Sequence, residues 1–416
     1  IEKFINSVSY QGMLGIPART LSVESVPGGN ATRFISIQSS DILAPGRPAM
    51  DTHGKELWAW DYASSYAASD TTTAATHLCS DVATVFAAGA RTVFLRDPWT
   101  SPGILDGEGN VTPFALAMAT LMRELANYTY AGSISLPGNT PNAIFSSPDN
   151  TKVLLWPASA PTEERIFLGE SVDIVDMYGR HTPAVAESGE SVVTVTTHPV
   201  ILDRVEPAVV DTRKTFKIEP DVIDSIYEVQ PVYVSFTNEF QTSIAGELIL
   251  KFPSGWEANP SFFFVRLNPG ATFRGRANIV VPYNALSGKH EITATLQLGD
   301  LGSQKITIVD RKDFTSSTFR MEVETRSSGV GVLIYQKVTN ISKRSADVSA
   351  FLEGQDLERV ERLPRRIEPG ASTTFSYTLS DASLWNGKRL RASVREVKTN
   401  RFLNEEFTVS TASAAR

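Results

Sequence analysis

The pentapeptide LNPGA at 267–271 recurs as IEPGA at 367–371. Each copy leads into a run of alternating apolar and polar residues, and each lies downstream of another alternating run that ends at an asparagine, Asn238 or Asn340. Pro-Gly makes tight turns, and alternation with a period of two is typical of a strand with one buried face. The shared order of strand, asparagine, strand, turn and strand predicts two immunoglobulin-like (Ig-like) β-sandwiches in tandem.

Short alternating runs broken by Gly, Pro, Asn and Asp also fill the chain from residue 133 onward, with almost no helical period. The sequence therefore predicts a mainly β, multidomain protein. Polar stretches without periodicity, at 206–215 and 310–318, are expected to be linkers. The predicted parts are a partial α/β segment at 1–131, a β-sandwich at 132–209, and Ig-like sandwiches at 216–310 and 318–416.

The composition limits the classes of protein to which the chain can belong. Its 416 residues are too many for one compact core, and 42% hydrophobic with 20% charged residues is typical of globular domains. A net charge of -7 with scattered Lys and Arg argues against a nucleic-acid partner. The one cysteine cannot form an internal disulfide, and no zinc-type spacing of Cys and His occurs, so we expect no cofactor or metal. No apolar run is long enough for a transmembrane segment.

Residues before 131 have a different pattern. Apolar residues recur at helical spacing over 71–88, between short apolar runs at 57–60 and 91–95 that are typical of buried strands. Thr112-Pro113 then starts a second helix, with Thr112 as the N-cap and proline in the first turn. The order strand, helix, strand, helix predicts part of a parallel α/β sheet.

Three stretches in this region carry a resemblance to a known family: KELWAWD at 55–61, RTVFLRDPW at 91–99 and GILDGEGNVTP at 103–113. Together they resemble the last strands and helices of a retaining (β/α)8-barrel glycoside hydrolase, of the clan that includes β-xylosidases and α-iduronidases. In that clan a small β-sandwich follows the barrel, and DIVDMYG at 173–179 resembles its strand and turn. The resemblance implies that residues before 131 are the end of a TIM-like barrel.

The resemblance also implies a set of site residues. Retaining enzymes attack the anomeric carbon with a carboxylate that lies about 5–5.5 Å from the acid/base carboxylate. The clan places this nucleophile, normally Glu, after the penultimate strand, and Asp61 has the matching position here. Flat aromatic rings suit stacking against sugars, and polar loop groups bind their hydroxyls, although Trp more often packs in cores and loop Asp more often stabilises turns. The substrate-binding candidates are Trp58, Trp60, Tyr62, Asp97 and Trp99, with Asp106 as a further loop carboxylate.

A complete barrel needs roughly 250 residues, about twice what precedes the first sandwich. The acid/base Glu of the clan sits in an Asn-Glu pair, and the pairs at 238–239 and 404–405 fall in the predicted Ig-like sandwiches. Under the resemblance, either an upstream segment or a partner chain completes the barrel, or these residues form a degenerate α/β remnant. Enzymatic activity depends on completion of the barrel.

These observations lead to one functional prediction and two alternatives. The prediction is the C-terminal section of a secreted glycoside-hydrolase-like protein that acts on or binds polysaccharide, located outside the cell or at its surface. A non-catalytic cell-surface or assembly protein is the first alternative, favoured by the long array of β-domains. The second is a carbohydrate-binding protein without hydrolysis, which would use the same aromatic residues.

Overall fold

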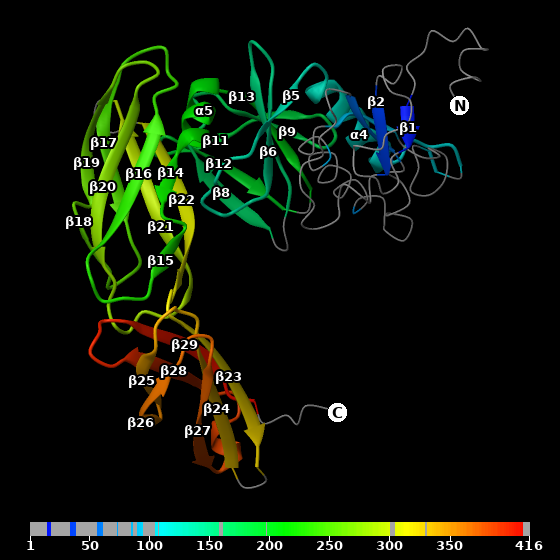
Figure 1. The fold of residues 1–416 in the computed structure, drawn as a ribbon. Helices are drawn as coiled ribbons and strands as arrows, with labels where there is room; N and C mark the ends of the chain where they lie inside the picture. Colours follow the sequence, from blue (N-terminus) through cyan, green and yellow to red (C-terminus); the bar gives the residue numbers. More distant parts are fainter. Residues whose placement is uncertain are drawn as a thin grey trace.

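The computed structural model consists mainly of β-sheets that follow one another along the chain (Figure 1). This confirms the predicted multidomain, β-sandwich-rich fold. The residues that the structure describes are 15–17, 34–38, 56–60, 73, 85, 90–94, 105–106, 108–157, 161–196, 198–299, 304–328 and 331–410.

The N-terminal segment contains a four-stranded, fully parallel sheet with strand order β1-β2-β3-β4. Its last two strands correspond to the predicted runs at 57–60 and 91–95, so the α/β prediction is confirmed for the described residues. Of the predicted helix at 71–88, the structure describes Thr73 and Val85, and both are helical. The strands are β1 (Gly15–Pro17), β2 (Phe34–Gln38), β3 (Glu56–Trp60) and β4 (Ala90–Phe94).

Helix α4 (Pro113–Leu125) ends this segment and begins where the sequence predicts. The Thr112 hydroxyl accepts a hydrogen bond from the Ala115 backbone N–H, which satisfies one free donor of the first turn. Phe114 and Leu121 are buried on one face of the helix, as their spacing requires. Local sequence chemistry thus fixes both the start of α4 and its buried face.

The first sandwich packs a six-stranded sheet, of order β10-β9-β13-β7-β6-β5, against a three-stranded sheet, of order β11-β12-β8. Its core includes Ile144, Val153, Leu168 and Val193. The strands are β5 (Thr129–Gly132), β6 (Asn142–Ser146), β7 (Thr151–Leu155), β8 (Thr162–Ile166), β9 (Asp173–Asp176), β10 (His181–Pro183), β11 (Val185–Glu187), β12 (Glu190–Val195) and β13 (Val200–Val205).

Helix α5 (Pro207–Thr215) corrects the expectation of an irregular linker at 206–215. Val209 and Val210 are fully buried, and each belongs to the core of a different sandwich. Arg213, also buried, donates hydrogen bonds to the carbonyls of Phe167 (3.3 Å) and Thr307 (2.8 Å), and burial lowers its pKa to about 10. The nine residues are too few for a clear periodic signal, so contacts on both sides stabilise this helix.

The second sandwich contains a four-stranded sheet, of order β14-β16-β20-β18, and a five-stranded sheet, of order β15-β22-β21-β17-β19. β22 continues to Thr315, so part of the expected linker at 310–318 is strand, and its Lys312 is buried between Asp221 and Asp310. The strands are β14 (Lys217–Glu219), β15 (Val222–Asp224), β16 (Gln230–Thr237), β17 (Ile244–Lys251), β18 (Glu257–Asn259), β19 (Phe262–Leu267), β20 (Thr272–Val280), β21 (Gly288–Leu298) and β22 (Gln304–Thr315).

The third sandwich packs a three-stranded sheet, of order β23-β24-β27, against a four-stranded sheet, of order β26-β25-β28-β29. Phe375 and Tyr377 lie in its core. The elements are β23 (Phe319–Ser327), β24 (Gly331–Asn340), β25 (Ala346–Gly354), β26 (Leu357–Ile367), β27 (Ser372–Ser380), the short helix α6 (Ala382–Trp385), β28 (Arg389–Glu396) and β29 (Phe402–Thr408).

The sequence repeat has a structural equivalent in these two sandwiches. Asn238 and Asn340 are fully buried, and each side-chain amide donates to two backbone carbonyls, one of them in the residue that opens LNPGA or IEPGA. The Pro-Gly turn closes on the same asparagine, because the N–H groups of Gly270 and Gly370 donate to the two asparagine carbonyls at 2.8 Å. We call each arrangement an asparagine staple.

The second and third sandwiches share a well-packed junction. Phe402 of β29 inserts into the core of the second sandwich, and the Asn404 side chain donates to the carbonyls of Tyr283 and Ala285, both at 2.8 Å. The Ser287 N–H donates in return to the Asn404 carbonyl. These contacts hold the two sandwiches in one relative orientation.

Candidate functional site

Of the predicted barrel site, the structure describes strand β3, which contains two of the predicted tryptophans. Trp58 and Trp60 lie in β3, between the parallel strands β2 and β4, and Trp60 is the last residue of β3. Trp60 therefore stands at the carboxyl edge of the sheet, where barrel enzymes build their sites. Four candidates lie outside the described residues, namely Asp61, Tyr62, Asp97 and Trp99. The roles predicted for all six residues stay predictions.

Asp106 organises its own loop. Its carboxylate accepts hydrogen bonds from the backbone N–H groups of Glu108 and Asn110 and from the Asn110 side chain. Hydrogen bonds from Asn110, first of all, lower the pKa of Asp106. Gly109, with φ of +87°, completes the turn. This carboxylate therefore stabilises a turn.

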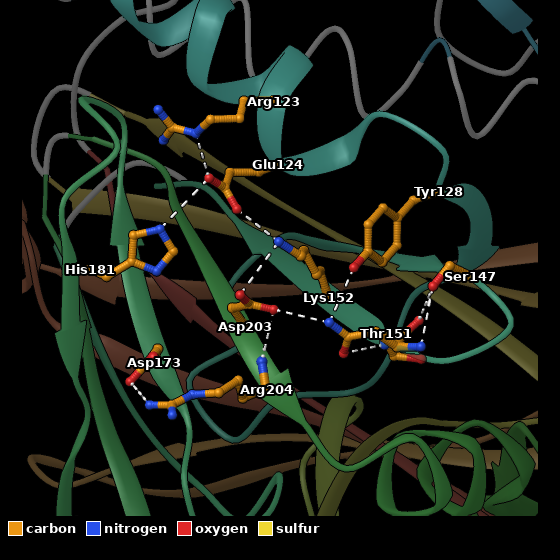
Figure 2. A network of polar contacts seen from close by, with 11 residues as sticks. Arg123, Glu124, Tyr128, Ser147, Thr151, Lys152, Asp173, His181, Asp203 and Arg204 are labelled. Carbon is orange, nitrogen blue, oxygen red and sulfur yellow. Dashed lines mark hydrogen bonds and ion pairs between the residues drawn. The ribbon is translucent and has the colours of Figure 1, made fainter.

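A buried ionic network joins α4 to the first sandwich (Figure 2). Lys152 of β7 donates a hydrogen bond to Glu124 of α4 at 2.7 Å and lies 3.4 Å from Asp203 of β13. Arg123 donates to the other Glu124 oxygen at 2.9 Å, and His181 lies 3.7 Å from that oxygen. The Lys152 and Glu124 side chains are each only 7% exposed.

The pKa shifts of Glu124 and Lys152 keep both side chains charged. Burial raises the pKa of Glu124, but hydrogen bonds from Lys152 and Arg123 outweigh it, so the pKa lies below its usual value. Burial lowers the pKa of Lys152, but Glu124 and Asp203 outweigh it, so that pKa is raised. A general acid or base needs a pKa close to the working pH. This network is therefore a structural clamp between α4 and the sandwich.

The main exposed aromatic surface among the described residues lies on edge strand β19. Phe262 and Phe264 are 52% and 76% exposed and meet edge to face, with ring centroids 5.8 Å apart. Between them, Phe263 points inward and packs on the core of the second sandwich, as does the buried Val265. Two large apolar rings side by side in solvent are unusual for a protein surface that contacts nothing.

The neighbouring strand β17 extends this surface. Ile249, 36% exposed, pairs with Phe262 across the two strands, and Glu247 pairs with Phe264. Arg266 follows Phe264 on the same face of β19 and is exposed. We call the set Phe262, Phe264, Ile249, Glu247 and Arg266 the β19 surface. It offers apolar faces together with a carboxylate and a guanidinium that can bind hydroxyl groups.

The β19 surface was not among the sites predicted from the sequence, although the chain contains a signal for it. Residues 262–264 are three consecutive phenylalanines, and neighbouring residues of a strand point to opposite faces. Because one face of β19 lies on the core, either one or two of the three rings must face solvent. Only the register of β19 in the sheet decides that number.

A known family of domains matches the part of the chain that contains the β19 surface. Residues 229–299 match the NPCBM-associated, NEW3 domain of alpha-galactosidase. The NEW3-like segment, as we call these residues, contains β17, β19 and the whole β19 surface. The match gives the chain a context associated with glycoside hydrolases and related to carbohydrates.

Comparison with solved structures returns matches of low similarity. A glycoside hydrolase family 30 xylanase from Clostridium acetobutylicum is 12% identical with a TM-score of 0.35, over 44% of this chain and 50% of that one. Red sea bream transglutaminase is 11% identical with a TM-score of 0.26, over 56% and 40%. Escherichia coli alpha-2-macroglobulin is 8% identical with a TM-score of 0.28, over 68% and 23%.

The chain thus spans half the length of the xylanase. Since these TM-scores are below 0.5, the functional argument rests on the NEW3-like segment alone. None of the curated proteins matches the chain. In the part of the chain that the structure describes, no helix has the length and apolar character needed to cross a membrane.

Proposed function

We propose that this chain is the C-terminal section of an extracellular or cell-surface glycoside-hydrolase-like protein, and that its NEW3-like segment contacts polysaccharide through the β19 surface. The observation that carries this proposal is the exposed pair Phe262 and Phe264 within a segment similar to a domain of alpha-galactosidase. Pyranose rings have apolar C–H faces, and such faces pack on aromatic rings.

The geometry favours an extended ligand over a single sugar. Each aromatic contact contributes about 0.5–1.5 kcal/mol, so two rings alone give weak binding. A polymer compensates, because repeated contacts raise the apparent affinity without new chemistry. Glu247 and Arg266, next to the rings, supply an acceptor and donors for sugar hydroxyls.

The test is retention by polysaccharide. The purified chain is run through native gels that contain soluble polysaccharides, among them galactan, galactomannan and xylan, beside a variant with Phe262→Ala and Phe264→Ala. At least one polymer should retard the wild type, and the variant should lose at least tenfold in affinity, with an unchanged melting temperature because both rings are exposed. Leu363→Ala is the matched control, since Leu363 is 85% exposed in the third sandwich. Equal retardation of both proteins would refute the proposed surface.

A non-catalytic assembly role is the second candidate, and the position of β19 favours it. Among the residues that the structure describes, β19 pairs with β17 alone. It therefore presents a free strand edge beside its two exposed rings, and such edges can pair with another chain. If β19 is an assembly interface, the wild type shows a concentration-dependent mass in light scattering and the double Phe variant stays monomeric. A monomeric wild type at all concentrations would rule this role out.

The finer hypothesis concerns hydrolysis. The clan resemblance supports Asp61 as nucleophile of a barrel that an upstream segment or partner chain completes, with Trp58, Trp60, Tyr62, Asp97 and Trp99 binding substrate. In that complete assembly, Asp61→Asn should remove turnover while polysaccharide retention by the β19 surface continues. Unchanged turnover in the variant would exclude Asp61 as the nucleophile.

A further inference from the structure

A cavity of about 570 Å³ lies where the second and third sandwiches meet. Sites for small ligands typically have roughly 300–1,000 Å³ and often occur between domains. One wall comes from the second sandwich, through Asn284 and Leu286, and the rest comes from strands β25, β26, β28 and β29 and from the turn between β25 and β26. We call it the junction cavity.

The floor of the junction cavity is a row of charges across three neighbouring strands. In the antiparallel sheet, Glu353 of β25 lies directly opposite Arg391 of β28, and Arg391 lies directly opposite Glu406 of β29. Residues that lie opposite one another point to the same face, so all three side chains share one face of the sheet. Glu353 and Arg391 form an ion pair and are 23% and 32% exposed. Arg391 also donates to the Asn284 carbonyl at 3.4 Å, which links the floor to the opposite wall.

Towards the rim, Glu406 at the end of this row meets Arg389. Arg389 and Glu406 are 75% and 44% exposed, and their closest nitrogen and oxygen atoms are 3.6 Å apart. Arg359 lies over the Phe351 ring at 3.7 Å from the centroid, which fixes its position beside the cavity. An exposed ion pair stabilises a protein by only about 0–1 kcal/mol, so a ligand can replace the Arg389–Glu406 contact at little cost.

The walls are held in place before any ligand binds. The same sheet face that carries the charges also carries Phe402 and Asn404, which fasten it to the second sandwich close to the cavity. Binding therefore needs little ordering of the protein, which favours affinity.

We propose that the junction cavity binds a uronic acid residue of an acidic oligosaccharide. Three arginines and two glutamates line it, so the lining has one excess positive charge, and Arg359 has a further carboxylate, Glu361, 3.3 Å away outside the lining. Guanidinium groups bind carboxylates by paired hydrogen bonds, which suits Arg389 at the rim. The carboxylate of Glu353 accepts hydrogen bonds from sugar hydroxyls, and Leu357 contacts the apolar ring face. The inference rests on the proposed carbohydrate function, but it uses a different surface.

The experiment is calorimetric titration of the purified chain with trigalacturonate and with neutral galactotriose at low salt. We expect trigalacturonate to bind at least tenfold more tightly. Arg389→Ala should weaken this binding at least tenfold without changing the melting temperature, because Arg389 is exposed. Arg366→Ala is the matched control, since Arg366 lies on β26, is 64% exposed and has its own ion pair with Glu368, outside the cavity.

A second variant should change affinity in the opposite direction. Glu406→Gln removes the carboxylate that competes for Arg389, so trigalacturonate should bind several-fold more tightly. Equal binding of the two trisaccharides, no binding of either, or an unchanged affinity in Arg389→Ala would each overturn the proposal. None of these results affects retention by the β19 surface, so the two proposals fail separately.

Discussion

The second and third sandwiches contain the same buried hydrogen-bonded asparagine but differ at their exposed strand edges. Each contains an asparagine staple, with side-chain hydrogen bonds of 3.0 and 3.1 Å from Asn238 and of 2.7 and 2.9 Å from Asn340. Outside, the second sandwich exposes Phe262 and Phe264 on an edge strand. In the third sandwich, arginines instead lie over the aromatic rings of the edge strand β27. Buried polar groups must keep their partners, whereas surfaces can diverge.

Two arginines of β26, Arg362 and Arg365, lie over aromatic rings of β27, and we call this pair the arginine cover. Arg362 lies 4.7 Å from the centroid of the Tyr377 ring and donates to the Ser376 carbonyl, and Arg365 lies 5.1 Å from that of Phe375 and donates to the Thr374 carbonyl. The two guanidinium groups thereby donate hydrogen bonds to carbonyls of β27 that would otherwise be open to a further strand. Charged side chains on edge strands hinder unwanted pairing. The third sandwich thus protects an edge of the kind that the second leaves open at β19.

The largest expected effect tests the shared interior. Asn238→Ala and Asn340→Ala should each lower the free energy of unfolding by about 3 kcal/mol, because each removes a fully buried amide and leaves two backbone carbonyls without their side-chain donor. Denaturant unfolding measures both losses. Asn268→Ala, at an exposed turn position, is the control and should cost under about 1 kcal/mol. Losses that differ by more than a factor of two would show that the two staples are not energetically equivalent.

A smaller effect is expected where the two sandwiches meet. Asn404→Ala removes the hydrogen bonds to Tyr283 and Ala285, which should cost about 2 kcal/mol and separate the unfolding of the sandwiches into two calorimetric transitions. Asn400→Ala, at the exposed side of the same junction, should leave the number of transitions unchanged. If Asn404→Ala also unfolds like the wild type, the contacts that remain, among them Phe402 packing and the backbone hydrogen bond from Ser287, are enough to couple the two sandwiches.

The third sandwich should also respond to pH through Glu405. Burial, and then the charge of Glu322, raise the pKa of Glu405 to about 7 from its ordinary 4.5. The folded state therefore binds this proton more tightly than the unfolded state, so stability falls as pH rises between about 4.5 and 7 and levels off above. Glu405→Gln should remove about 1–2 kcal/mol of this fall, less than the full shift would give, because the carboxyl is partly exposed and solvent screens it.

Denaturant unfolding at pH 5 and pH 8 measures this dependence. Glu368→Gln, an exposed carboxyl of the same sandwich, is the control and should keep the wild-type dependence. An identical pH dependence in Glu405→Gln and the wild type would contradict the assignment.

The smallest effect is expected at the arginine cover. Arg365→Ala should lower the free energy of unfolding by under about 1 kcal/mol, since exposed cation–π contacts contribute about 0.5–1 kcal/mol. Its clearer consequence is on association, because the β27 edge loses a hydrogen-bond donor and a charge. Light scattering should show more association than in Arg320→Ala, an exposed arginine on β23. Equal association of the two variants would mean that Arg365 does not protect the edge.

Part of this molecule was predictable because the controlling chemistry is local. The Thr112 cap and Pro113 fix the start of α4, and the LNPGA and IEPGA turns with their asparagines predict two related sandwiches. Helix α5 was not predictable, since Val209 and Val210 are buried by partners from different sandwiches. Of the six site residues predicted near the barrel end, Trp58 and Trp60 lie in β3, and the roles of all six remain to be tested.

The sequence by itself thus determined the class of fold, the tandem repeat and the presence of three adjacent phenylalanines. Only the tertiary structure decided that Phe262 and Phe264 face solvent, and that Arg389, Glu353 and Asn284 line one cavity. Turns and caps depend on residues a few positions apart, which a pattern can reveal. Strand register and junctions between sandwiches depend on contacts between residues far apart in the chain, and these form only when the whole fold is assembled.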